Sequence, residues 1–386
     1  MAVIYFDNSA TTKMSKRALD KMCKVASEHY GNPSSLHSLG LDAEKQLESA
    51  REVILKSLGV LRFTRGEIIF TSGGTESNNI AILGSVFAKK RKGNEKILTT
   101  EGEHASVEEP LAFLEKMGYN IVRVPTRGGE IDLDFLEKNA QGAILATFMH
   151  VNNETGALYD VKSAFDIVKE KSPDAVLHTD CVQSYLKVPF TKKSLGADLI
   201  SVSSHKVNGP KGVGALYVSP EIIKAKKLSP LFHGGGQETG MRSGTENLYS
   251  ICAFAEAVSE HLSNKENVQK IEELRAYILE GVSKIEGVSP NLPKVNAPHI
   301  LNIAVEGIRS ETMLHFLSRE GIYISSGSAC ASNAPKKTSH ALESFGLTQS
   351  KMDSSIRISL SHENTREEAD LLFVALEKAT KSLVRR

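Results

Sequence analysis

Asp180 and Lys206 are the two side chains whose types and spacing first suggest chemistry. Asp180 directly follows the apolar run 175–179, and Lys206 ends Ser203-Ser204-His205-Lys206, just after the run 198–202. Ligands of open α/β sheets bind beyond the carboxyl ends of the strands. Two such ends could bring a carboxylate and an amine to one cavity, although either residue alone is more simply explained as a helix cap or a surface lysine.

A glycine turn after a third apolar run could supply a phosphate site. The run 67–71 leads into Ser72-Gly73-Gly74-Thr75-Glu76-Ser77, where glycines admit an anion and the start of a helix offers free N–H groups. Alone, this segment is more simply a turn with a helix cap, and it has neither the Walker A nor the Rossmann glycine pattern. Together with Asp180 and Lys206 it suits pyridoxal phosphate, because the lysine can form the Schiff base and the aspartate can keep the pyridine nitrogen protonated.

Two further side chains could act on a substrate or a ring. His104 also follows a predicted strand, and an imidazole there could stack on a planar ring and transfer protons near neutral pH. Arg357 alternates with Ile356 and Ile358, so its guanidinium would lie on the opposite face and could bind a substrate carboxylate through two hydrogen bonds. The plainer alternatives are a capping histidine and an exposed strand arginine.

One of the four cysteines stands in a segment typical of an exposed loop. Cys330 lies within 325–337, which is rich in Ser, Gly, Pro and Lys, and two nearby lysines favour the thiolate. Cys23 and Cys252 fall within helical patterns, and Cys181 follows a strand end. We predict that these three cysteines pack in the core.

The composition excludes several classes of protein. The 386 residues include only four cysteines and no C-x-x-C pair, so we expect neither a disulfide framework nor a metal site. The net charge of +1 argues against direct binding of nucleic acid. The first residues do not form a signal peptide, and the apolar runs are too short to span a bilayer. We therefore expect a cytoplasmic protein without a membrane partner.

Short apolar strands alternate with helical segments through the first two thirds of the chain. This alternation predicts an α/β fold in which helices flank a mostly parallel sheet. The predicted strands are 67–71, 96–100, 120–124, 143–148, 175–179, 198–202 and 213–218. An amphipathic helix is predicted over 42–58, where apolar residues recur every three or four positions.

The character of the sequence changes near residue 256. We predict one long connecting helix over 256–285, then strands at 300–305, 322–325 and 356–360 with a helix near 311–319. A last helix should begin at Thr365, because Thr365-x-x-Glu368 has the form of a capping box. We therefore divide the chain into a large cofactor-binding domain, residues 16–261, and a smaller α/β domain. The smaller domain comprises residues 1–15 and 262–386 and carries the cysteine loop, about 325–340.

Ten motifs follow one another in the chain. They are 5–12 (YFDNSATT), 31–37 (GNPSSLH), 70–77 (FTSGGTES), Glu103-His104, 152–156 (NNETG), 178–183 (HTDCVQ), 204–212 (SHKVNGPKG), 234–238 (GGGQE), 242–245 (RSGT) and 326–330 (SGSAC). In this order they resemble the NifS/IscS-type cysteine desulfurases of group I, class V enzymes of fold-type I that depend on pyridoxal phosphate. The resemblance covers almost the whole chain and implies the fold of that transferase family.

The resemblance also implies roles for residues around the ring of the cofactor. Lys206 would form the Schiff base, Asp180 would pair with the pyridinium and Gln183 with the ring hydroxyl. His104 would stack on the ring. Asn153 belongs to the same cofactor site and, with Arg357, would hold the substrate carboxylate.

The phosphate and the sulfur have their own residues under this resemblance. Gly74, Thr75, Ser203 and His205 would bind the phosphate. Thr245 would reach the phosphate site of the other subunit in a homodimer, and Cys330 would accept the sulfur.

The implied activity is removal of sulfur from L-cysteine, which yields L-alanine and a persulfide on Cys330. A scaffold for iron–sulfur clusters or a thiolation enzyme would then accept the sulfur. The segment after Cys330, with Lys336 and Lys337, departs from the family's pattern and leaves that acceptor open. The alternatives are a selenocysteine lyase or related β-eliminating enzyme and, in a different class, a non-catalytic subunit that binds pyridoxal phosphate.

Overall fold

A seven-stranded mixed sheet forms the centre of the larger part of the molecule. The computed structural model describes residues 3–60, 66–91, 93, 95–326 and 339–383. The strand order is β2-β8-β7-β6-β5-β3-β4, and β8 is the one strand antiparallel to its neighbours in this sheet. The strands are β2 (Glu67–Thr71), β3 (Lys96–Thr100), β4 (Asn120–Val124), β5 (Ala143–Met149), β6 (Val176–Asp180), β7 (Leu199–Ser203) and β8 (Gly214–Val218).

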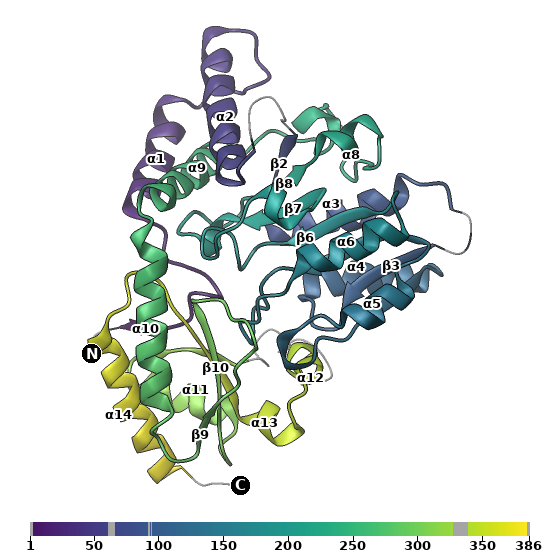
Figure 1. Ribbon diagram of the computed structural model, residues 1–386. Coiled ribbons are helices and arrows are strands. Elements are labelled where there is room, and N and C mark those ends of the chain that lie inside the picture. The colour runs from purple at the N-terminus through teal and green to yellow at the C-terminus, as the bar shows by residue number, and fades with distance from the viewer. Residues whose placement is uncertain (1–2, 61–65, 92, 94, 327–338, 384–386) are drawn as a thin grey trace.

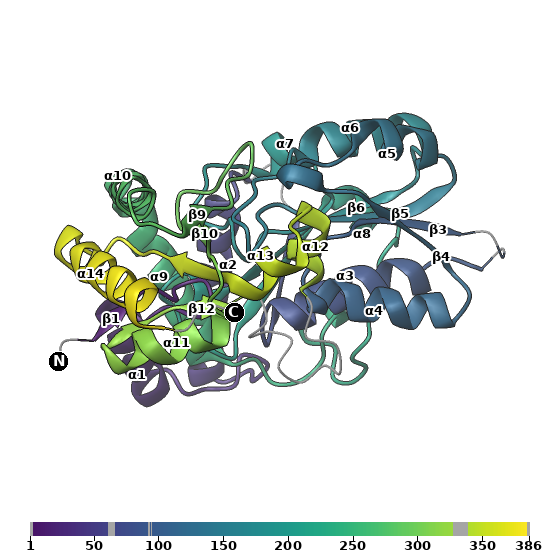
Figure 2. The ribbon, with the colours of Figure 1, turned by 90° about the horizontal axis from the view of Figure 1, so that it is seen from below.

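Helices cover both faces of this sheet, with α3 and α4 on one side and α5 and α6 on the other (Figure 2). Alternate strand residues enter different cores: Ile68 and Phe70 pack on one face and Ile69 on the other. The helices of this part are α1 (Lys16–Glu28), α2 (Ser38–Ser57), α3 (Gly74–Phe87), α4 (Ala105–Lys116), α5 (Leu133–Asn139), α6 (Val161–Lys171), α7 (Lys192–Leu195), α8 (Pro220–Lys224) and α9 (Leu248–Ser263), with 3₁₀ turns η2 (Arg127–Gly129), η3 (Ser204–Lys206) and η4 (Glu238–Gly240).

A second, antiparallel sheet has its own core of apolar side chains (Figure 1). Its order is β12-β13-β10-β9, and β1 pairs in parallel with β11 beside it. The elements are β1 (Ile4–Tyr5), β9 (Val288–Pro290), β10 (Ile300–Val305), β11 (Ile322–Tyr323), β12 (Ser325–Ser326), β13 (Ser355–Ser359), α10 (Glu266–Val282), α11 (Ser310–Arg319), α12 (His340–Phe345), α13 (Gln349–Ser354) and α14 (Arg366–Ser382).

The predicted α/β class and the mostly parallel sheet are confirmed, but two predicted elements are wrong. The single helix over 256–285 is two helices, because Asn264 leaves the helical conformation and its amide donates to the Glu260 carbonyl. The strand predicted over 322–325 is also divided, since β11 pairs with β1 whereas β12 pairs with β13. Among the described residues, no helix is both long and apolar enough to cross a membrane.

The predicted capping box at the start of α14 is present, and it gives a test of local stability. Thr365 accepts from the backbone N–H of Glu368, and the Glu368 carboxylate accepts from the N–H of Thr365. Thr365→Ala should lower the free energy of unfolding by about 1 kcal/mol in urea denaturation. Thr348→Ala removes a longer cap bond (3.5 Å) and should cost less. Equal losses would show that the capping box adds nothing.

Candidate active site

Four predicted site residues come together where the two sheets meet. Asp180 ends β6, Lys206 ends the turn η3 after β7, and His104 caps α4 after β3. Arg357 reaches the same place from β13 of the smaller sheet. The charges of Asp180, Lys206 and Arg357 all act on the His104 imidazole, whose pKa is lowered mainly by burial. The chain therefore assembles one carboxylate, two cations and a neutral imidazole around one site.

The Asp180 carboxylate is buried and held from two sides. It accepts hydrogen bonds from the Asn78 side-chain amide (2.8 Å) and from the Val182 backbone N–H (2.9 Å). The sequence prediction missed Asn78. Its position three residues after Thr75 in α3, and hence on the same side of the helix, was the available signal.

The Lys206 amine faces the N-terminal segment. It donates to the carbonyl oxygens of Ser9 (2.5 Å) and Ala10 (2.7 Å). The backbone of Thr12 in turn donates to the carbonyl of His205 (2.8 Å). The first residues of the chain thus form one wall of the site.

Several polar atoms near Lys206 are buried and lack a hydrogen-bond partner among the described residues. They are the hydroxyl oxygens of Ser203 and Ser204 and the side-chain oxygen of Gln183. A Cβ atom on Gly74 would lie 2.7 Å from the Val182 side chain and 3.6 Å from that of Ser203, so the start of α3 closely approaches the end of β7. Burial lowers the pKa of His205 to about 4. The structure thus brings Gly74, Ser203 and the N-terminus of α3 together.

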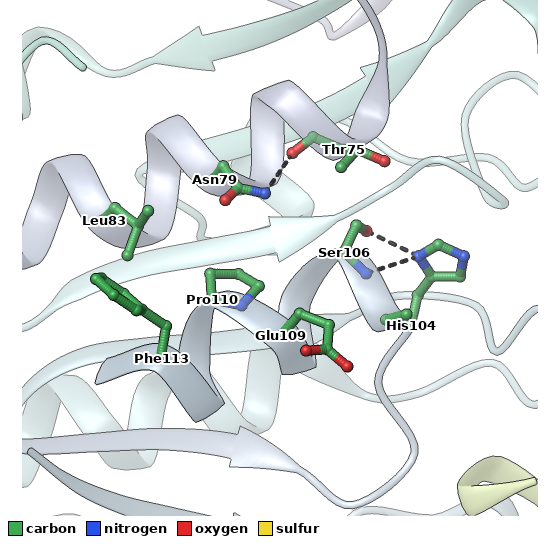
Figure 3. Close-up of a pocket in the computed structure, with 9 residues that line it drawn as sticks. Thr75, Asn79, Leu83, His104, Ser106, Glu109, Pro110 and Phe113 are labelled. Carbon is green, nitrogen blue, oxygen red and sulfur yellow. Dashed lines mark hydrogen bonds between the residues drawn. The ribbon is translucent and has the colours of Figure 1, made fainter. Parts of the chain in front are cut away.

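A cavity of about 450 Å³ runs between α3 and α4 from this end of the sheet. Figure 3 shows Thr75 and His104 at one end and Leu83 and Phe113 at the other. The His104 ring is fixed because its Nδ1 accepts from the Ser106 backbone N–H (3.1 Å) and also contacts the Ser106 hydroxyl (2.8 Å). No hydrogen bond joins its other ring nitrogen to the described residues.

Arg357 is buried, so the alternative of an exposed strand arginine is wrong. Its guanidinium donates to the Asn153 carbonyl and to the Asp7 carboxylate, both at 2.8 Å, and the Nε atom has no partner among the described residues. The neighbours Ile356 and Ile358 face the small core, as the alternation predicted. Arg357 therefore points out of the small core and toward the larger part.

Two residues predicted for the site, Thr245 and Cys330, are not among the residues that the structure places around Asp180, Lys206 and Arg357. Thr245 is exposed in the loop 232–247, whose Arg242 donates to Glu76 of α3 (2.8 Å). Cys330 lies outside the described residues. On either side of the undescribed segment 327–338, Ser326 and Ser339 are buried, and the Ser339 hydroxyl donates to Glu154 (2.6 Å).

The prediction for the other cysteines holds for two of the three. Cys181 and Cys252 are buried in the main core, and burial raises the pKa of Cys181 to about 12. Cys23 is exposed, contrary to prediction. Only Ala18 and Val25 of α1 are buried, so the polar side of this helix includes Cys23.

Sequence reasoning also missed two buried ionisable groups. Burial raises the pKa of Glu103, which accepts from Thr100 and the Met149 N–H, to about 8. Burial, with the nearby charges of Lys206 and Arg357, lowers the pKa of Lys187 to about 7. Both groups can therefore exist in the neutral form near pH 7. The apolar segment around Lys187 gave no sign of such a role.

Comparison with known proteins identifies the family. Residues 4–372 match the aminotransferase class-V family. The "Cysteine desulfurase IscS" of Dictyoglomus turgidum is 39% identical over 385 residues, covering 98% of this chain and 95% of that protein. The chain therefore belongs to the aminotransferase class-V family.

Solved structures agree with this assignment. A "NIFS-like protein" superposes with a TM-score of 0.91 at 34% identity, covering 99% of this chain and 100% of that one. A structure described as "SspA in complex with cysteine" gives a TM-score of 0.81 at 32% identity, covering 94% of this chain and 100% of that one. The expected fold of the NifS-like enzymes is thereby confirmed.

The buried His178 beside this site predicts how stability depends on pH. Its ring nitrogens contact the hydroxyls of Thr147 (2.7 Å) and Ser201 (2.9 Å), and burial lowers the pKa of His178 to about 3. Below about pH 6.5, the His178 imidazole therefore binds a proton in the unfolded chain but stays neutral in the folded chain. The free energy of unfolding should fall as the pH drops below about 6.5, by about 1.4 kcal/mol per pH unit for this histidine.

Urea denaturation between pH 7 and pH 5 measures this dependence. His178→Gln keeps a neutral polar group but cannot titrate, so its stability should fall less steeply with decreasing pH. Parallel curves for the wild-type chain and the variant would contradict the assigned pKa.

Proposed function

We propose that this protein is a cysteine desulfurase dependent on pyridoxal phosphate. It would convert L-cysteine to L-alanine and retain the sulfur as a persulfide on Cys330. The observation that carries the proposal is the convergence of Asp180, His104, Lys206 and Arg357 on one site. The comparisons support it, since the Dictyoglomus turgidum relative is named a cysteine desulfurase.

The residues present fit a cofactor that carries a phosphate and a pyridine ring. Ser203, Ser204 and Gln183 offer buried oxygen atoms that have no partner within the described part of the chain, and the start of α3 supplies N–H groups for an anion. Gly74, Thr75, Ser203 and His205 would hold the phosphate. Asp180 would pair with the ring nitrogen, Gln183 with the ring hydroxyl, and His104 would stack on the ring. When bound, pyridoxal phosphate acts as an electron sink.

Side chains of the protein would attach the cofactor, transfer protons and orient the substrate. Lys206 would hold the cofactor covalently and, once released by the substrate, move a proton at the substrate Cα. Arg357 and Asn153 would orient the substrate carboxylate. His104, kept neutral by burial, can accept or donate a proton at the nitrogen that Ser106 leaves free.

The thiolate of Cys330 would form the new S–S bond while the C–S bond of the substrate breaks. L-cysteine and the Cys330 thiol together supply every atom of L-alanine and the persulfide, so the transfer needs no external oxidant. The solved relative described in complex with cysteine supports this substrate.

The assembly and the place of action also belong to the proposal. We infer a homodimer in which Thr245 completes the phosphate site of the other subunit, and its exposure leaves it available for that contact. The sulfur would pass to an iron–sulfur scaffold or a thiolation enzyme in the cytoplasm. The separate cores support the division into a large domain (16–261) and a small domain (1–15 with 262–386).

Lys206→Ala tests the attachment of the cofactor. The wild-type chain with pyridoxal phosphate should be yellow, and borohydride should bleach the colour and fix the cofactor covalently. The variant should lose this covalent attachment, because the substitution removes the amine assigned to the Schiff base. Absorption spectra and intact mass after borohydride measure the outcome, with Lys211→Ala as the matched control. A colourless wild-type chain that borohydride leaves unlabelled would refute the cofactor assignment.

Cys330→Ser tests the sulfur acceptor separately. The variant should keep the cofactor and its colour, because Cys330 is not assigned to cofactor binding, but it should form no persulfide from L-cysteine. Trapping with an alkylating reagent and mass spectrometry measures the persulfide, and Cys23→Ser, which alters the exposed cysteine of α1, is the control. Alanine and sulfide release at the wild-type rate would exclude Cys330 as the acceptor.

A further inference from the structure

Arg51 and Glu238 form a buried ion pair whose place in the fold is not explained by the chemistry above. The two nitrogens at the end of the Arg51 guanidinium donate to the two Glu238 oxygens, at 3.0 and 3.1 Å. Both residues are buried, and the Arg51 guanidinium also lies over the Phe70 ring. A desolvated ion pair stabilises a structure only where further hydrogen bonds satisfy it, so its other contacts matter.

Besides a hydrogen bond from Arg51 to Glu48 (2.9 Å), those contacts are made to the free edge of the seven-stranded sheet. β2 is an edge strand, paired with β8 on one side only. On its other side, the Phe70 N–H donates to Glu238 (2.8 Å) and the Ile68 carbonyl accepts from Arg51. The pair thus replaces the missing neighbouring strand. Two residues after Phe70, this strand passes into Ser72-Gly73-Gly74-Thr75, the segment assigned to the phosphate.

Glu238 simultaneously fixes the loop 232–247. Glu238 and Thr239 both have positive φ (49° and 54°), a conformation that residues with a side chain adopt at a cost. Much of the loop around them is exposed, including Gly234, Gly235 and Gly236. The buried Glu238 carboxylate attaches this loop to the edge of the sheet, while Arg242 of the same loop contacts Glu76 of α3. The same loop carries Thr245.

We propose that the Arg51–Glu238 pair is a positioning unit for the phosphate of the cofactor. It fixes the strand that leads into the phosphate turn of its own subunit, and it fixes the loop whose Thr245 would complete the phosphate site of the other subunit. Neither side chain needs to touch the cofactor. This inference rests on the proposed function, because the ligand positioned is the phosphate of pyridoxal phosphate.

The test compares pyridoxal phosphate with pyridoxal, which has the same ring and aldehyde but no phosphate. Absorbance titration of the apoprotein gives the affinity for each ligand. In Glu238→Gln, the affinity for pyridoxal phosphate should fall by about tenfold while that for pyridoxal changes by less than about twofold. A general folding defect would weaken both ligands alike and leave their ratio unchanged.

A milder variant and a control accompany Glu238→Gln. Arg51→Lys keeps the charge but loses the two parallel hydrogen bonds. It should therefore also lower the ratio of the affinity for pyridoxal phosphate to the affinity for pyridoxal. It decides the question if Glu238→Gln does not fold. Arg123→Lys alters another Arg–Glu cluster, with Glu108 and Glu115, and should leave the ratio unchanged.

Thr245→Val separates this inference from the proposed function. If Thr245→Val lowers the ratio and neither Glu238→Gln nor Arg51→Lys does, the positioning role is refuted and the function stands. Equal loss of both ligands in Glu238→Gln and Arg51→Lys would also refute it, because the pair would then be merely structural. A wild-type chain that binds neither ligand would overturn the proposed function and this inference together.

Discussion

The hydrogen bonds from the Lys206 amine to the carbonyl oxygens of Ser9 and Ala10 connect the two parts of the molecule at the site. The N-terminal segment that supplies those oxygens is itself fixed to the smaller sheet. The backbone N–H of Ser359 in β13 donates to the carbonyl of Phe6 (2.7 Å), and Asp7 accepts from Arg357. In Figure 1 this purple segment runs beside the smaller sheet before it reaches α1. Lys206 and Arg357, from different sheets, are therefore placed relative to each other by a few residues at the start of the chain.

The electrostatic character of the site follows from this placement. Lys206, Arg357 and Lys187 bring positive charge into a buried region. Burial, with the charges of Lys206 and Lys187, lowers the pKa of His205 to about 4. Burial, with the charges of Lys187 and Arg357, also holds the pKa of the fully buried His299 well below its usual value. The Nζ atom of Lys187 and the Nε atom of Arg357 are buried and have no hydrogen-bond partner among the described residues, so the region offers cationic donors to an anion. A ligand with a phosphate and a carboxylate would bring negative charge to this region, which is why the site suits an anionic cofactor and an amino-acid substrate together.

Sequence alone predicted those features that depend on local pattern. The bounds of β2, β3 and β4 agree with prediction because buried strands appear in the sequence as short apolar runs. Asp180 and Lys206 could be selected as site residues because ligands bind at the carboxyl ends of strands. The break at Asn264 was missed because amphipathic spacing continues across a single non-helical residue. Asn78 could have been inferred from helix spacing. Lys187 could not, because its role depends on charges that only the fold brings near it.

The Arg51–Glu238 pair illustrates why other features of the structure could not be predicted from local sequence patterns. The two residues are 187 positions apart, and neither stands in a strand. Their partners are a backbone N–H and a backbone carbonyl on a sheet edge, which any residue of that strand would provide. An apolar pair could fill the same volume, but it would leave those two backbone groups unsatisfied, and an orphaned buried amide costs about 1–3 kcal/mol. An edge strand that must hold a phosphate turn in place thus requires polar side chains from elsewhere in the chain, and this pair meets that requirement from α2 and η4.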